Sequence, residues 1–511
     1  MELKEKLREV ESINLLDSEE IRHVEPVDIN PPAGYIPVTN EALAWLTNAA
    51  STNEIGRNGP AMASASFPGE TNSNLKLFEA LFGRDSLQIA QDVLGCYPEL
   101  ARTTLKSLSA LQGCTYDLFS EEEPGRIVHE VRNWSSDELA RNISSDRGWH
   151  WPYYGSVDAT PKFIHLMTDY ARRVPNGFSI FNETYIDKNG QLRQMAHAYR
   201  AAIGWVSRRM DSNPEGFLEF KAAFPGSIVN QAWKDSGDAY HHVNGDIANH
   251  DNGIASIEVQ GETYQALLDA ADMFERVFNE PSVAAELKAR AERLRCMAIQ
   301  YLWNDSQGGF FVLGTDRDEN GHLRQLAIKT SNMGHLLGSG LLDGNDIDST
   351  DLREALIRQL FSQPMLGLNG IRTLASDEVR YCDQAYHNGS VWPMDNRRIS
   401  EGLARCGYHR LSNLLNQKQL DVIRDTGLFP EYARGSDDPN HRLNDHIVDV
   451  YDGRFDRLNR KAQPPQLVQG WTVSAIKSIE SERQAGLTPT AVGSRQDNLE
   501  RKLLSAIGAW N

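Results

Sequence analysis

Two short segments far apart in the chain, residues 230–242 (NQAWKDSGDAYHH) and 427–435 (GLFPEYARG), each place a carboxylate among aromatic residues and glycines. In the first segment Asp235 follows Trp233, and in the second Glu431 lies between two glycines. Cleavage of a glycosidic bond needs one carboxyl group that gives a proton to the leaving oxygen and another that activates water. The two segments therefore indicate a general acid and a general base.

Asp235 is the candidate acid, because contact with the Trp233 indole would raise the pKa of its carboxyl and keep the proton on. Asp238, three residues later, is the rival for this role. A plainer interpretation is a helix start in which Asp235 or Ser236 caps the following turn.

Glu431 is the candidate base. Pro430 removes the preceding amide donor, and Gly427 and Gly435 bracket the loop, so the carboxylate is expected on a rigid support. Taken alone, a Pro-Glu pair is also an ordinary loop or first-turn feature.

Further loops supply groups that bind sugars. Aromatic rings pack on the apolar faces of pyranoses, while carboxylates, amides and guanidinium groups take the hydroxyls. Arg84 and Asp85 offer a donor fork beside an acceptor for adjacent hydroxyls. The candidate substrate-binding residues are Arg84, Asp85, Glu130, Trp151, Tyr154, Asp158, Trp233, Lys234, Asp238, Gln260, His387, Asn388, Trp392 and Tyr432.

Helices are the elements expected to position these residues. Apolar residues recur at helical spacing, whereas strand-like alternation is confined to pieces such as 308–316, too few for a (β/α)₈ barrel. The expected helices span 73–95, 100–113, 196–210, 259–278, 284–304, 391–407 and 409–423. Short connectors alternate with long loops, which predicts a mainly α fold, an (α/α)₆ double-ring barrel with its long loops at one mouth.

Three regions are expected along the chain. Residues 1–60, rich in Pro, Gly, Asn and Ser, are predicted to form an arm or cap, and 61–483 the catalytic barrel. Residues 484–511 are predicted to be a polar connector followed by a short helix that packs on the barrel.

Composition restricts the partners. A net charge of −18 over 511 residues disfavours nucleic acid and anionic lipid. The chain has no apolar run of about eighteen residues, and its N-terminus does not resemble a secretion signal, so a cytoplasmic location is expected. A homodimer is possible.

No cofactor or metal is expected. Five scattered cysteines form no CxxC pair with zinc-site spacing and are interpreted as reduced thiols. Asp377, Glu378 and Asp383, or the acidic run at 316–320, lack the ligand pattern of a known calcium loop.

Eight motifs, in this order, resemble the glucosidase domain of glycogen debranching enzymes and its bacterial amylo-α-1,6-glucosidase relatives. They are FGRDS, EEPGRIVHE, YYGSVDATP, NQAWKDSGDA, GIASIEVQG, GIRTLASDEVRY, YHNGSVWPMDN and LFPEYARG, between about residues 75 and 480. The clan also includes glucoamylases and hydrolases of glucosylglycerate and mannosylglycerate. The resemblance implies the (α/α)₆ barrel, an α-glucoside substrate and inversion at the anomeric carbon. It also implies Asp235 as acid, Glu431 as base, and Arg84 with Asp85 on the outer hydroxyls of the sugar.

The chain departs from this family in ways that bear on the substrate. Ala232 stands where relatives often have Gly, and neither a glucanotransferase half nor a large N-terminal β-rich domain is found. A small glucoside, α-1,6- or α-1,2-linked or with an anionic aglycone such as glucosylglycerate, is therefore expected, and Arg126, Arg132, Lys234 and Arg380 lie near the motifs.

Other functions fit the same barrel. A sugar epimerase or isomerase would move a proton with a histidine such as His129, His242 or His387 and would not need Glu431. A glycoside phosphorylase would replace the activated water by phosphate. A sugar-binding protein without catalysis would use the aromatic residues alone.

Overall fold

The computed structural model describes residues 80–132, 137–344, 347–440, 442–443, 465–466, 468–484 and 494–508. Helices dominate this part of the chain, and its strands are only two to four residues long, as predicted. None of the helices in these ranges combines the length and apolar character that crossing a membrane requires. The predicted arm at 1–60 lies outside the described residues.

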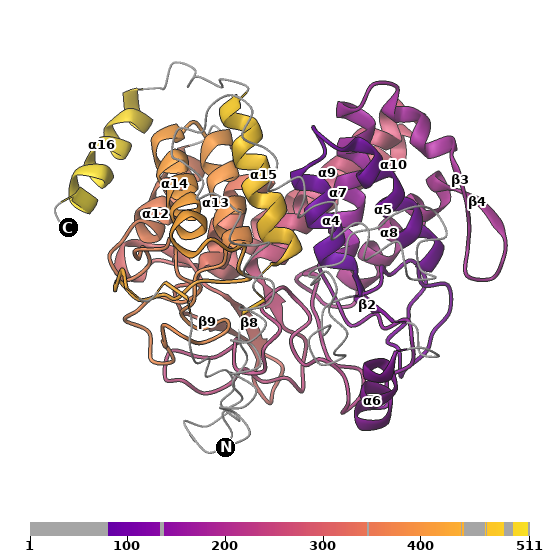
Figure 1. Cartoon of the computed structure of the whole chain (residues 1–511). Helices are drawn as coiled ribbons and strands as arrows, with labels where there is room; N and C mark the ends of the chain where they lie inside the picture. Colours follow the sequence, from indigo (N-terminus) through magenta and orange to yellow (C-terminus); the bar gives the residue numbers. More distant parts are fainter. Residues whose placement is uncertain are drawn as a thin grey trace.

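An inner ring of helices closes on itself. It consists of α4 (Gly83–Asp92), α7 (Ala159–Arg173), α9 (Ile257–Arg276), α11 (Leu336–Ser339), α13 (Pro393–Arg405) and α15 (Gly470–Gln484). Each of these helices packs against the next in chain order, and α15 packs back against α4. Figure 1 shows α15 beside α4 although they lie at opposite ends of the described chain.

A second layer of helices covers the ring. It contains α5 (Pro98–Leu111), α8 (Met195–Met210), α10 (Pro281–Leu302), α12 (Ile347–Leu360), α14 (His409–Thr426) and α16 (Ser494–Gly508). α5, α8, α10 and α14 pack on α4, α7, α9 and α13, whereas α12 packs on the 3₁₀ helix η4 (Ser331–His335) and α16 on α14. The double ring predicted from the sequence is confirmed.

The two layers differ in how their helices are buried. In the inner helix α9, residues are buried around the whole circumference, including the polar Glu258 and Gln260. The outer helix α10 buries one stripe that includes Leu287 and Leu294 and exposes its charged residues. This is the amphipathic pattern of a helix with one solvent face, and it explains why α10 was the easier helix to recognise.

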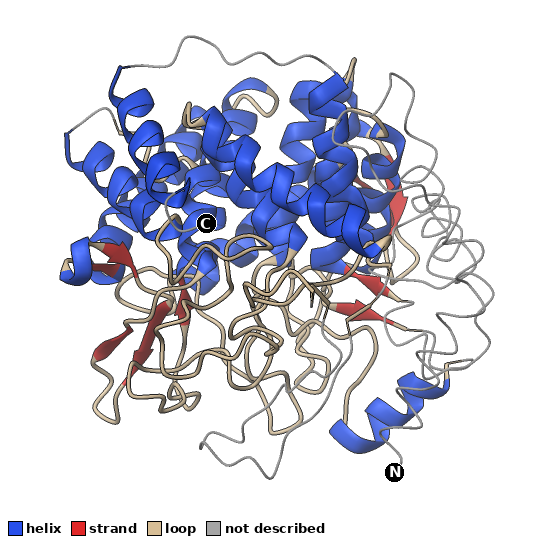
Figure 2. Cartoon of the chain, turned by 60° about the vertical axis from the view of Figure 1, so that its left-hand side comes forward, coloured by secondary structure: helices blue, strands red, loops and turns tan. Residues whose placement is uncertain are grey.

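Short strands and long loops gather at one end of the helical layer, as Figure 2 shows. β1 (Leu81–Phe82) pairs with β2 (Glu130–Val131), and β5 (Ala255–Ser256), β8 (Gly314–Arg317) and β9 (Leu323–Leu326) form a three-stranded sheet. The remaining pairs are β3 (Thr184–Ile186) with β4 (Leu192–Gln194) and β6 (Trp303–Asn304) with β7 (Phe310–Phe311). A helix α6 (Glu138–Arg147) and 3₁₀ helices at Gly177–Asn182 and Ser306–Gly308 complete the connections.

Two expectations for helices need correction. The helix expected at 73–95 begins only at Gly83, because Leu81 and Phe82 pair with β2 as a strand; residues 73–79 lie outside the described ranges. Helices α6, α7, α12 and α15 were not among those predicted; the segment before α7 had been interpreted only as a sugar-binding loop.

Candidate active site

Arg84, in the first turn of α4, ties the loop that carries Asp235 to the inner ring. Its Nε donates to Asp158 Oδ2 at 2.7 Å, just before α7, and its Nη2 donates to the Ala232 carbonyl at 3.0 Å. Its Nη1 lies 3.6 Å from Asp235 Oδ2. Arg84 is only 4% exposed, whereas 34% of the Asp235 side chain is accessible, so Asp235 is the member of this cluster that faces open space.

Burial raises the pKa of Asp235 to about 6. Arg84 opposes this shift, and the nearby Asp158 carboxylate adds to it. Asp85, the neighbour of Arg84, is 6% exposed, and burial raises its pKa to about 7 against the effect of Arg84.

Glu431 is 2% exposed and accepts two hydrogen bonds. The Tyr386 hydroxyl donates to its Oε1, and the Gln466 amide donates to its Oε2 at 3.1 Å. Burial raises the pKa of Glu431 to about 8; the two hydrogen bonds lower it, and the charges of Asp85 and Asp235 raise it further. The pKa of Glu431 therefore depends on the charges of Asp85 and Asp235.

Three consecutive residues connect the two carboxylate loops. Tyr386 donates to Glu431, and His387 Nδ1 lies 2.9 Å from the Ser236 hydroxyl and accepts from the Ser236 amide at 3.3 Å. Asn388 Nδ2 donates to the carbonyl and the Oδ2 of Asp238, at 3.0 and 3.1 Å. The segment 386–388 thus holds both candidate catalytic loops.

Aromatic side chains pack behind the carboxylates. The Trp392 ring stacks on Tyr432, with centroids 5.1 Å apart, and on His387, at 5.2 Å. Trp233 meets Trp392 edge-on at 5.8 Å. All four rings are nearly buried, so they form a supporting wall.

Asp238 lies in a different environment from Asp235. It is 2% exposed and accepts from Asn388, and burial raises its pKa while Arg380 opposes the shift. Asp238 therefore supports the turn that carries Asp235.

Two predicted substrate-binding residues have buried structural bonds instead. Lys234 is fully buried and donates to the Thr373 carbonyl, and burial lowers its pKa to about 8. Gln260 accepts from the Leu218 amide and donates to the Leu218 carbonyl, both at 3.0 Å. These contacts hold both side chains within the protein, and a role of either in sugar binding stays a prediction.

Three further predicted residues have their polar atoms engaged elsewhere. Tyr154 is fully buried and donates to the Leu111 carbonyl at the end of α5, so it is a core residue. The Trp151 indole donates to Ser144 Oγ of α6 at 2.9 Å, and Glu130 pairs with Arg132. The structure does not bring these three side chains to the carboxylates.

Two residues with contacts to the site were missed in the sequence. Tyr386 begins the YHNGS motif, and Ser236 follows Asp235, but only their distant partners reveal what they do. The signal available in the sequence was a hydroxyl-bearing residue beside a predicted site residue: Tyr386 precedes His387, and Ser236 follows Asp235.

In the described ranges, no cluster of His, Cys, Asp and Glu is arranged to hold a metal ion. The acidic residues considered for calcium pair with cations: Asp377 with Lys329, Asp383 with Arg434, and Asp316 with Arg324.

Comparisons with known proteins give a family match for part of the chain. Residues 202–442 match the family model of the mannosylglycerate hydrolase MGH1-like glycoside hydrolase domain. The search of curated proteins found no match. The matched residues include Asp235 and Glu431.

Two of the solved structures that match this chain illustrate the similarity. One is the GH63 mannosylglycerate hydrolase from Thermus thermophilus in complex with Tris and D-glycerate, at a TM-score of 0.56 and 14% identity over 87% of this chain and 99% of that one. The other is a bacterial glucoamylase complexed with acarbose, at a TM-score of 0.46 and 11% identity over 80% of this chain and 49% of that one. Residues 202–442 therefore match an MGH1-like glycoside hydrolase domain, and the chain has the six-hairpin (α/α)₆ barrel fold.

Proposed function

We propose that the protein is an inverting, exo-acting α-glucosidase in which Asp235 is the general acid and Glu431 the general base. The observation that carries this proposal is that one segment, 386–388, holds both carboxylate loops: Tyr386 donates to Glu431, and His387 and Asn388 contact Ser236 and Asp238 beside Asp235. Asp235 gives its proton to the leaving oxygen while Glu431 takes one from the attacking water.

Exposure and bonding favour Asp235 over Asp238 as the acid. A third of the Asp235 side chain is accessible, whereas Asp238 is buried and bonded to Asn388. A proton donor must reach the leaving oxygen, so the accessible carboxyl is the better placed of the two.

Arg84 and Asp85 are proposed to hold the outer hydroxyls of the terminal sugar. Arg84 already donates to Asp158 and Ala232, so its position is fixed before substrate arrives. A preorganised donor loses little conformational entropy on binding.

We propose a small α-glycoside as substrate, with glucosylglycerate and mannosylglycerate as the leading candidates. The Thermus thermophilus enzyme acts on mannosylglycerate by its name, which adds a mannoside to the glucosides expected from the sequence. The test is a panel of isomaltose, trehalose, sucrose, kojibiose, glucosylglycerate and mannosylglycerate, assayed for free glucose or mannose.

Substitutions at the two carboxyls test the assignment. Asp235→Asn and Glu431→Gln are each expected to lower kcat about 10²–10⁴-fold, because each removes one proton transfer. Asp238→Asn is the matched control and is expected to keep more activity than Asp235→Asn. Full activity of the Asp235→Asn variant would refute the assignment of Asp235 as the general acid. Loss of activity in the Asp238→Asn variant alone would refute it as well.

The histidine chemistry of an isomerase gains no support. Burial holds the pKa of His387 well below its usual range, and its Nδ1 is engaged by Ser236. His242 bonds to Asp316. Interconversion of a free aldose and ketose, with no hydrolysis of the panel, would nevertheless replace the hydrolase proposal.

A further inference from the structure

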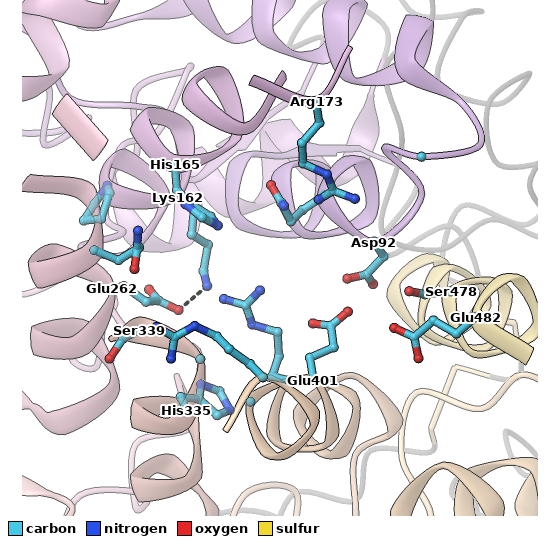
Figure 3. Close-up of a pocket in the computed structure, with 18 of the residues that line it drawn as sticks. Asp92, Lys162, His165, Arg173, Glu262, His335, Ser339, Glu401, Ser478 and Glu482 are labelled. Carbon is cyan, nitrogen blue, oxygen red and sulfur yellow. Dashed lines mark hydrogen bonds and ion pairs between the residues drawn. The ribbon is translucent and has the colours of Figure 1, made fainter. Parts of the chain in front are cut away.

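A second cavity lies at the end of the barrel away from the candidate active site. Its volume is about 590 Å³, within the range typical of small-molecule sites, and residues from all of α4, α7, α9, α11, α13 and α15 line it. Figure 3 shows charged side chains from these helices converging on it, among them Asp92, Lys162 and Glu401.

The helix ends give this cavity a negative bias. Arg84 and Asp395 lie in the first turns of α4 and α13, near the candidate active site, whereas Asp92 and Arg405 end the same helices and line the second cavity. The last turns of α4 and α13 therefore line part of the cavity, where the helix dipole favours a cation. Helices α7 and α9 also contribute residues near their N-terminal ends, Lys162 and Glu262.

Most charges around the cavity are already neutralised by partners. Lys162 pairs with Glu262, and Arg405 pairs with Asp343. Glu401 and Glu482 both pair with Arg397.

Two opposite charges are not neutralised in this way. Among the described residues, Arg398 makes no hydrogen bond or ion pair. Asp92 accepts from Gln88 at 2.6 Å and Ser474 at 2.7 Å but forms no ion pair within the same ranges. Burial and the charge of Glu401 raise the pKa of Asp92 to about 7, and the charge of Arg398 opposes this shift. The cavity therefore holds one guanidinium and one carboxyl that lack an ion pair.

One wall of the cavity includes a buried histidine. His335 is 8% exposed and lines the cavity; its Nε2 lies 2.7 Å from Asp395 Oδ1, and its buried Nδ1 has no hydrogen-bond partner in the described part of the chain. His335 also stacks on Trp233 at 6.2 Å, so these two rings separate the cavity from the candidate active site.

We propose that this cavity binds a small zwitterion, with its carboxylate at Arg398 and its ammonium group near Asp92 and Glu401. A simple anion would meet the negative helix ends and the acidic side chains, and a simple cation would leave Arg398 unpaired. A molecule that carries both charges satisfies both groups. This site is independent of the catalytic proposal.

Calorimetry with glycylglycine tests the proposal. Binding to the full chain is expected, while acetate and methylammonium are expected to bind at least about tenfold more weakly, because each carries only one of the two charges. Arg398→Gln and Asp92→Asn are each expected to weaken glycylglycine binding by about tenfold or more.

Two control variants locate the binding. Arg501→Gln, which removes a surface arginine of α16, and Asp235→Asn, in the candidate active site, are both expected to leave the affinity unchanged. Circular dichroism of each variant shows whether it folds. If Asp92→Asn does not fold, the affinity of Arg398→Gln for glycylglycine alone decides the proposal. The proposal is overturned if glycylglycine does not bind, if acetate binds as tightly, if Arg398→Gln binds normally, or if Asp235→Asn abolishes binding.

Discussion

The protonation state of the candidate site depends on two side chains, Asp235 and Glu431. Asp235 has a pKa of about 6 and Glu431 a pKa of about 8, both raised by burial, and their charges are coupled. Between these values the pair shares one proton, which resides mainly on Glu431, because Arg84 favours ionised Asp235. The productive state, with the proton on Asp235, is then a minor form of the free enzyme.

This coupling predicts a bell-shaped dependence of kcat/KM on pH, with limbs near 6 and 8. Below about 6 both carboxyls are protonated and the base is lost; above about 8 both are ionised and the acid is lost. Initial rates over roughly pH 4–10 cover both limbs of the profile. A rate that rises steadily to the highest pH would contradict the assignment of an acid with a pKa near 6.

Tyr386→Phe isolates one hydrogen bond to the base. Loss of the hydroxyl removes an interaction that lowers the pKa of Glu431, so the alkaline limb is expected to move to higher pH. A hydrogen bond to a charged group contributes about 1.5–3 kcal/mol, which corresponds to roughly a 10–150-fold fall in kcat. An unchanged limb with a normal rate would show that Tyr386 does not act on Glu431.

At the level of elements, the loop that follows the segment 386–388 positions the candidate site together with the helices. Gly389 comes next with φ +149°, and a Cβ there would lie 2.2 Å from the Cys382 carbonyl oxygen. The glycine therefore allows the loop to turn back so that the segment 386–388 reaches both carboxylate loops.

Gly389→Ala is expected to lower the free energy of unfolding by about 1–3 kcal/mol and to reduce activity. Denaturant unfolding measures the first effect. Gly338→Ala is the matched control, because a Cβ on that glycine in α11 meets no atom within 4 Å. Equal stability of the two variants would contradict the proposed constraint on the loop.

The sequence predicts elements better than it predicts contacts between them. Helical spacing located α9 and α10 to within a few residues, because their apolar residues are numerous and local. It missed α7, whose first turn follows a loop rich in aromatic residues and glycine. The fold class depends on such local patterns, and it was predicted correctly.

Long-range partners are the part of the candidate site that the sequence does not reveal. Tyr154 and Lys234 were singled out by residue type, but the ends of their side chains bond to Leu111 and Thr373, which no local spacing reveals. Arg84 and Asp158, two other predicted site residues, bond to each other at the start of inner helices α4 and α7. Their role in catalysis stays a prediction.

At the scale of the whole molecule, the ring of inner helices has two unlike ends. The first turns of α4 and α13 lie near the candidate active site, while their last turns line the second cavity. His335 and Trp233 lie between the two. One barrel thus positions a candidate catalytic site and a separate candidate binding site on the same axis.

The stereochemistry of the first product tests the central claim most directly. In an inverting enzyme, Glu431 activates a water on the face of the sugar opposite to the group that Asp235 protonates. Proton NMR during hydrolysis of α-D-glucosyl fluoride, recorded before mutarotation, is predicted to show β-glucose first. Release of α-glucose first would contradict the account, because it would require retention and a covalent or double-displacement route.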